Sequence, residues 1–205
     1  MLGYEENYNK KQQIVKKNNT LHKSSPKRRE DSPSYHAYGK TAAVEFTCEV
    51  TKKQSLNTIA MHTASANKGA KGYDWENKTV IQIPRIELPV VAAVLIRKTK
   101  RASFSQNSMM GEKGFTMEHD GEVVRLIMTD SEKDDREIEL TPEDVFQISA
   151  LFLRQIRSNM NWMSAADIIN LIEQTIVPLK DTTYHRYNTD EDNAADGSIA
   201  DSFNS

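Results

Sequence analysis

Short segments in which apolar and polar residues alternate dominate the middle of this chain, between residues 41 and 140. The clearest is 41–50, where apolar side chains occupy every second position from Ala42 to Val50. A period of two places successive side chains on opposite faces of a strand, so the pattern predicts a strand with one buried face. Further strands are predicted at 55–66, 77–84, 101–106, 114–119, 123–129 and 136–140. Because turn-forming residues separate the last four, they predict an antiparallel meander.

Two helices follow the meander. Thr141, Pro142 and the acids after them combine a capping residue, a proline at the first helical position and negative charge in the first turn, which together predict a helix start. A second helix is predicted at 164–179, opening at Ser164. The continuously apolar segment 86–98 is long for a strand, and we favour a buried helix beginning near Pro89 over a buried strand. These elements predict an α+β domain.

Charge is segregated along the chain. Residues 1–105 hold 19 lysines and arginines against nine acids, and residues 106–205 hold eight against 20, although the whole chain has a net charge of only −2. The two ends are too polar to repay the entropy lost on ordering. We therefore expect a disordered basic arm at 1–34, a folded domain at 35–180 and a disordered acidic tail at 181–205. A basic half also points to a polyanionic partner.

Several classes of protein are excluded or disfavoured. Cys48 is the single cysteine, which excludes a disulfide scaffold, and no apolar run approaches the about 20 residues that span a bilayer. No signal peptide is predicted, so we expect a reducing cytoplasmic compartment in a bacterial or virus-infected cell, with a nuclear location left open. The five histidines are scattered, and no phosphate-binding glycine motif occurs. We expect no catalytic residues, no metal site, no cofactor and no membrane partner.

Aromatic residues are interleaved with basic ones in the positive half. Aromatic faces stack on unpaired bases for about 1–3 kcal/mol each, and lysines follow the phosphates, so this mixture favours single strands over duplexes. Under the alternative interpretation, Tyr73 and Trp75 close the end of a sheet and the lysines lie in ordinary solvated turns. The predicted nucleic-acid-binding residues are Tyr38, Lys40, Lys68, Lys71, Tyr73, Trp75, Lys78, Lys98, Lys100, Arg101 and Phe104.

Three segments resemble the Whirly single-stranded-DNA-binding family. YGKTAAVEF resembles its K-G-K-A-A-L segment, YDWENKTVIQI its Y-D-W strand, and REIELTPEDVFQISALF the start of its helix. The resemblance implies two antiparallel four-stranded sheets with two helices, oligomerisation through the helices, and single strands held between sheet edges and loops. It places Gly39 and Lys40 on the first motif, residues 73–75 and Lys78 on the second, and 146–152 on the third. Here Gly-Lys-Thr replaces the family's Lys-Gly-Lys.

These observations together predict a sequence-tolerant single-stranded-DNA-binding protein that forms a homo-oligomer through its helices and acts in replication or recombination. In the acidic tail, Ile199 and Phe203 are the only large apolar residues near the end, and we expect them to anchor replication or recombination proteins. The alternatives are an RNA-binding or annealing protein, and a transcription coactivator or interaction scaffold that binds no nucleic acid through this domain.

Overall fold

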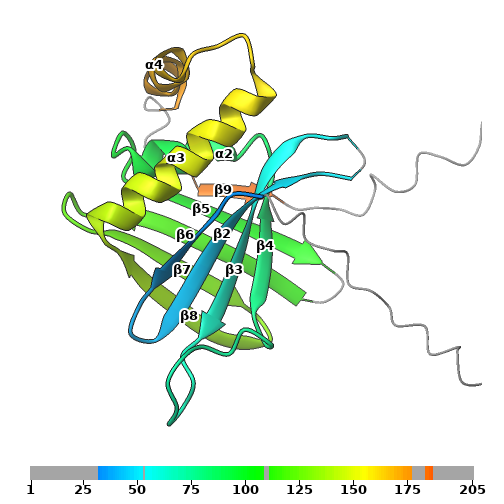
Figure 1. Cartoon of the computed structure of the whole chain (residues 1–205), viewed down its shortest axis with the longest axis vertical. Helices are drawn as coiled ribbons and strands as arrows, with labels where there is room; N and C mark the ends of the chain where they lie inside the picture. The colour runs from blue at the N-terminus through cyan, green and yellow to red at the C-terminus, as the bar shows by residue number, and fades with distance from the viewer. Residues whose placement is uncertain (1–31, 53, 109–110, 177–182, 187–205) are drawn as a thin grey trace, which may run out of the picture. The chain divides into compact units, whose positions relative to one another are not determined.

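The computed structural model describes residues 32–52, 54–108, 111–176 and 183–186, which include two sheets and three helices (Figure 1). The first sheet is antiparallel, and its strands lie in chain order: β1 (Ser34–Tyr38), β2 (Ala42–Val50), β3 (Asn57–Ser65) and β4 (Thr79–Ile83). The periodicity of the sequence did not predict β1, because only Ala37 of its five residues is buried and the remaining side chains are polar or aromatic.

The second sheet is the expected meander with one addition. It contains β5 (Arg101–Ser108), β6 (Gly111–His119), β7 (Val124–Asp130) and β8 (Lys133–Leu140), all antiparallel. A fifth strand, β9 (Thr183–Arg186), pairs in parallel with the free edge of β5. This strand lies within the range predicted as acidic tail. The four residues of β9 are too few and too polar for an alternating pattern to distinguish a strand from coil. The strand therefore depends on pairing with the edge that β5 leaves open.

The described residues contain three helices, where the resemblance implied two. The additional helix is α2 (Leu88–Leu95), which confirms the helix favoured near Pro89; all its residues except Pro89 are buried, and it packs against β5, β6 and the two later helices. The other two are α3 (Pro142–Asn159) and α4 (Ala165–Thr175). Both open with a capping box, formed by Thr141 with Asp144 and by Ser164 with Asp167. The domain is therefore α+β with two sheets, as expected.

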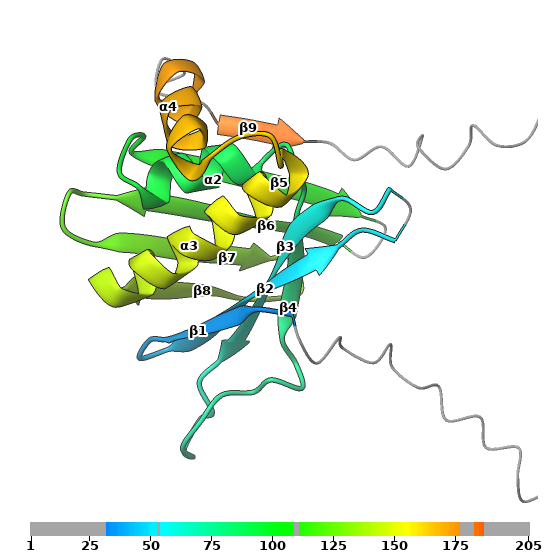
Figure 2. The same ribbon diagram turned by 45° about the horizontal axis from the view of Figure 1, so that its top comes forward.

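The main core lies between the facing sheets and beneath α3 (Figure 2). Alternate residues of β2 and β3, such as Phe46 and Met61, are fully buried there, opposite inward residues of the second sheet such as Met117. Phe152 of α3 packs edge-on against Phe46, with ring centroids 6.1 Å apart. The inward faces are apolar along most of their length, and Thr79, Asp130 and Arg136 are buried polar exceptions, so most other polar groups lie on the outward faces and in the loops between strands.

Polar side chains fasten α3 to the first sheet. The buried amide of Gln155 donates to the carbonyl oxygens of Glu49 at 3.0 Å and Thr58 at 2.6 Å. At the other end of α3, the Tyr35 hydroxyl donates to a carboxylate oxygen of Asp144 at 2.9 Å. Burial, and then this hydrogen bond to Asp144, raise the pKa of Tyr35. The bond fixes β1, and therefore the position of Tyr38 at its end.

Candidate nucleic-acid interface

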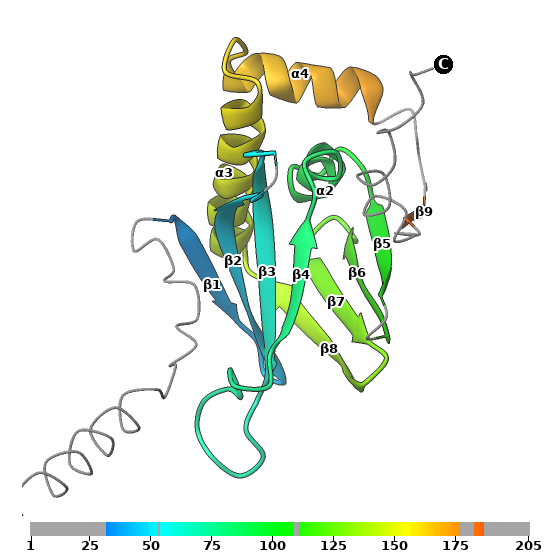
Figure 3. The same ribbon diagram turned by 90° about the vertical axis from the view of Figure 1, so that its right-hand side faces the viewer.

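Two loops meet at one end of the first sheet, on the side away from the helices (Figure 3). They are the β1–β2 turn (39–41) and the β3–β4 loop (66–78). The amide of Ala66 donates to the carbonyl of Thr41 at 2.8 Å, and the Tyr73 hydroxyl donates to the carbonyl of Gly39 at 2.7 Å. We call this end the basic–aromatic end; it carries the predicted site residues Tyr38, Lys40, Lys68, Lys71, Tyr73, Trp75 and Lys78.

The aromatic rings of this end contact one another. Tyr38 is 62% exposed, and its ring centroid lies 5.7 Å from that of Tyr73. His36, which sequence reasoning missed, stacks on Tyr38 at 6.0 Å and meets Trp75 edge-on at 5.7 Å. Because β1 alternates, His36 and Tyr38 share its outward face, and recognising β1 in the sequence would have revealed the pair. Tyr73 combines two roles, since its hydroxyl holds the turn while its ring supports Tyr38.

The four predicted lysines of this end have no carboxylate partner among the residues that the structure describes. Lys40, Lys68 and Lys71 are exposed and Lys78 is half-buried, and within the described part of the chain none of the four forms an ion pair. The nearby carboxylate of Asp74 accepts hydrogen bonds from the side chain and backbone of Asn77, at 2.8 and 3.2 Å. These bonds lower the pKa of Asp74. The four ammonium groups are therefore available to phosphates.

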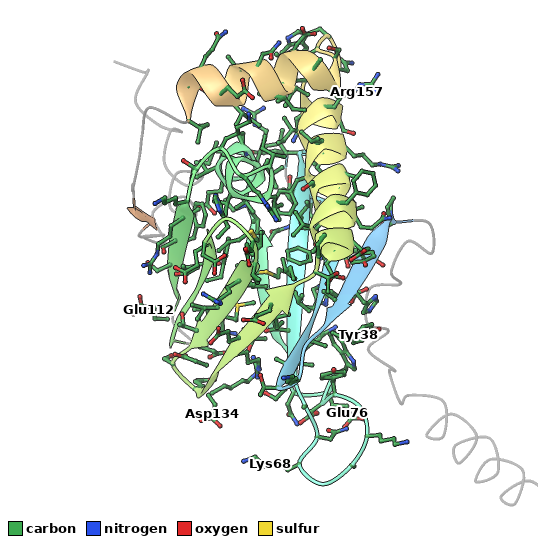
Figure 4. All side chains as sticks on the ribbon, turned by 90° about the vertical axis from the view of Figure 1, so that its left-hand side faces the viewer. Tyr38, Lys68, Glu76, Glu112, Asp134 and Arg157 are labelled. Carbon is green, nitrogen blue, oxygen red and sulfur yellow. The ribbon has the colours of Figure 1, made fainter. Side chains whose placement is uncertain are left out.

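Glycines shape the loop that carries two of these lysines. Gly69 and Gly72 adopt φ angles of +81° and +100°, in the region that disfavours side chains. The amide of Asn67 donates to the carbonyl of Gly72 at 3.0 Å, which closes the tip of the loop. Lys68 and Lys71 are exposed residues of this closed tip, and Figure 4 shows Lys68 at the same end of the domain as Tyr38 and Glu76.

The remaining basic residues of the predicted site lie elsewhere. Lys98, Lys100 and Arg101 belong to the connection from α2 into β5, near α4 and far from the β3–β4 loop (Figure 3). The Lys98 ammonium is 2.7 Å from a carboxylate oxygen of Glu173, and the Arg101 side chain is 3.9 Å from Glu118. The structure thus divides the predicted residues into two separate groups, and carboxylates partner much of the second.

The prediction that Phe104 binds nucleic acid has to be corrected. It is only 6% exposed and stacks on Phe115 inside the core, with ring centroids 5.0 Å apart. A ring in this position has no face open to a base. The alternation of β5, with buried Ala102 two residues earlier, places Phe104 on the inward face, and the same parity argument applied to the sequence would have removed it. The tail residues Ile199 and Phe203 lie outside the described residues.

The second sheet contributes residues that the sequence did not associate with this end. The ammonium of Lys133, where β8 begins, donates to the carbonyl oxygens of Asn77 at 3.0 Å and Lys78 at 3.2 Å. Asp134 of the same hairpin also lies at this end (Figure 4). These contacts join residues 55 and 56 positions apart, so no local pattern could have indicated them.

Within the described residues, no group of three or more histidine, cysteine or acidic side chains is arranged to hold a metal ion, and no described helix is long and apolar enough to cross a membrane. Burial raises the pKa of the Cys48 thiol. A hollow of about 790 Å³ between Val50 and Val80 opens beside the β2–β3 turn, and none of the predicted site residues lines it.

Comparison with known proteins supports the fold. No family model matches the chain, and no curated protein matches its sequence. Among solved structures, the crystal structure of WHY1 from Arabidopsis thaliana matches with a TM-score of 0.50 and 14% sequence identity. The match covers 70% of this chain and 94% of the WHY1 chain. At this identity the similarity shows the fold alone, and the domain has a Whirly-like fold.

Proposed function

We propose that this domain binds single-stranded nucleic acid at its basic–aromatic end without reading the base sequence. The observation that carries the proposal is the exposed ring of Tyr38 at the end of β1, next to two loops that hydrogen bonds hold together and whose lysines form no ion pair among the described residues. The Whirly-like fold supports the proposal, since the sequence motifs that resemble the family, around Lys40 and Tyr73, fall on these same loops.

The chemistry favours single strands over duplexes. Tyr38 and Trp75 offer ring surface for stacking, which contributes about 1–3 kcal/mol per base and is available only where bases are unpaired. Each lysine that neutralises a phosphate releases a counterion and adds about −0.7 to the slope of log K against log salt. Four lysines therefore give a slope of about −3. Stacking on an aromatic face and neutralising phosphates both tolerate any base, so we expect the binding to be sequence-tolerant.

The helices provide a surface for self-association. Three large apolar side chains are exposed on α3, α4 and the connection between them: Phe146 at 70%, Trp162 at 77% and Leu171 at 42%. Covering such side chains is favourable, so we propose that the chain forms a homo-oligomer through this surface. A non-enzymatic role in protecting and presenting DNA single strands during replication or recombination is consistent with both surfaces. Mass measurement by light scattering, with Phe146→Ala expected to lower the mass, tests the assembly.

The test of binding compares a residue of the site with an exposed residue outside it. Fluorescence anisotropy of labelled oligo-dT, oligo-rU and duplex DNA is measured at two salt concentrations with the parent, Trp75→Ala and Ile86→Ala. The parent should bind single strands more tightly than duplex, and Trp75→Ala should weaken binding by about 1–3 kcal/mol. Ile86 is 63% exposed and belongs to neither proposed surface, so Ile86→Ala is the control and should leave single-strand affinity near the parent value. A folded Trp75→Ala variant that binds like the parent, or equal affinity for duplex, would refute this site. Tighter binding of oligo-rU would identify RNA as the ligand.

A further inference from the structure

A single hydroxyl lies between two buried charges directly beneath the basic–aromatic end. Thr79 accepts a hydrogen bond from Nη1 of Arg136 at 2.6 Å and donates one to Oδ2 of Asp130 at 2.7 Å. Thr79 is fully buried, Asp130 is 4% exposed and Arg136 is 6% exposed. Thr79 belongs to the first sheet, whereas Asp130 and Arg136 belong to the second. The hydroxyl therefore connects the two sheets.

This bridge holds both ends of the β3–β4 loop. Thr79 is the first residue after the loop, and Ser65, the last residue before it, accepts a hydrogen bond from Nε of Arg136 at 2.9 Å. Lys133 adds a third attachment through its bonds to the carbonyls of Asn77 and Lys78. One hairpin of the second sheet, β7–β8, thus fastens the loop at its start, at its end and along its last residues.

Stability alone does not account for this arrangement. Burying charged groups carries a desolvation cost that well-packed apolar residues avoid, so an apolar replacement is often as stable or more stable. Burial by itself raises the pKa of Asp130, but the hydrogen bond from Thr79, the amide of Glu132 and the ammonium groups of Lys113 and Lys133 together lower it. The carboxylate is thus held ionised. A satisfied polar network of this kind specifies one geometry in a way that apolar contacts do not.

We propose that Thr79 and Lys133 are positioning residues, which hold the β3–β4 loop in the orientation that presents Trp75 and its lysines to a single strand. The inference rests on the proposed function and adds to it the part of the second sheet that controls the site. A loop already ordered in its binding geometry avoids the entropy of ordering several long side chains when the ligand arrives. Loss of the bridge should therefore weaken affinity by about 3- to 30-fold even though no group that contacts the ligand has been removed.

The first experiment exchanges the bridging hydroxyl. Thr79→Val keeps the shape of the side chain and removes the hydroxyl, whereas Thr79→Ser keeps the hydroxyl. Oligo-dT affinity, its salt slope and amide exchange of residues 66–78 are measured for each variant. We expect Thr79→Val to lose affinity and loop protection with the salt slope unchanged, and Thr79→Ser to retain most of both. A folded Thr79→Val variant with parent affinity overturns the proposal.

A second pair of variants, Lys133→Met and Lys113→Met, tests the same proposal if Thr79→Val fails to fold. Lys113 and Lys133 both lie 3.9 Å from the Asp130 carboxylate, but among the described contacts only Lys133 donates to the loop. Lys133→Met should lower affinity and loop protection, whereas Lys113→Met should not. Equal effects of the two substitutions would overturn the positioning role of Lys133. A smaller salt slope for Lys133→Met would also overturn it, because Lys133 would then contact a phosphate itself. A parent that binds no oligonucleotide refutes the proposed function itself, which is a different outcome from parent binding that these variants do not change.

Discussion

Replacing Tyr38 by alanine separates a binding role from a structural one, because this ring is the most exposed aromatic of the site. Its side chain is 62% exposed, so only about a third of it is buried. Full burial of an aromatic side chain contributes about 1.5–3 kcal/mol, so a third contributes about 0.5–1 kcal/mol. The contact with the Tyr73 ring adds about 0.5–1.5 kcal/mol. We therefore expect Tyr38→Ala to lower the free energy of unfolding by about 1–2.5 kcal/mol and to leave the fold intact.

Tyr38→Ala should also weaken the binding of a single strand. If one base stacks on Tyr38, the variant loses about 1–3 kcal/mol of binding free energy, or about 5- to 150-fold in Kd. Anisotropy of labelled oligo-dT measures Kd, and urea denaturation measures stability on the same samples. Tyr38→Phe keeps the ring and should bind like the parent. Ile86→Ala removes a side chain that is 63% exposed and lies outside both proposed surfaces, and it serves as the control. Parent-like affinity of Tyr38→Ala, or equal losses in Tyr38→Phe, would refute stacking at this position.

Three further predictions follow from charge. Replacing Lys68 and Lys71 together by glutamine should reduce the magnitude of the salt slope by about 1.4, whereas Lys98→Gln, which removes an ion pair with α4, should leave the slope unchanged in the same titration. Hydrogen bonds from the N-cap serine of α4 lower the pKa of Asp167 below that of the unfolded chain, so this group stabilises the fold above about pH 4 and loses that contribution as the pH falls. Urea denaturation at pH 7, 5 and 3 should show a smaller acid loss for Asp167→Asn, and an identical loss would contradict this. Residues 187–205 carry most of the acids of the tail, which compete with the ligand for the basic site, so deleting them should tighten oligo-dT binding at low salt. The same deletion should abolish recruitment of replication or recombination proteins. Weaker oligo-dT binding at low salt would instead place the tail in the site.

Much of the secondary structure could be predicted because its causes are local. The capping residues and proline that open α3 act within one helical turn, and the alternation along β2 is visible in ten residues. The same local patterns mark the loop from Lys68 to Lys78 as basic and aromatic. By contrast, β1 has little alternation to detect, and β9 forms only because β5 presents a free edge.

The composition of the site was decided by tertiary structure. The sequence placed Lys98 and Lys71 in one predicted group, but the crossing of the chain through α2 puts them at opposite ends of the domain (Figure 3). The sequence pattern predicted Thr79 only as part of a strand. The packing of one sheet on the other brings its hydroxyl between Asp130 and Arg136, which are 51 and 57 residues away. Periodicity and capping report on neighbours within a few residues of the chain. Contacts between sheets depend instead on how whole elements pack, which no short pattern records.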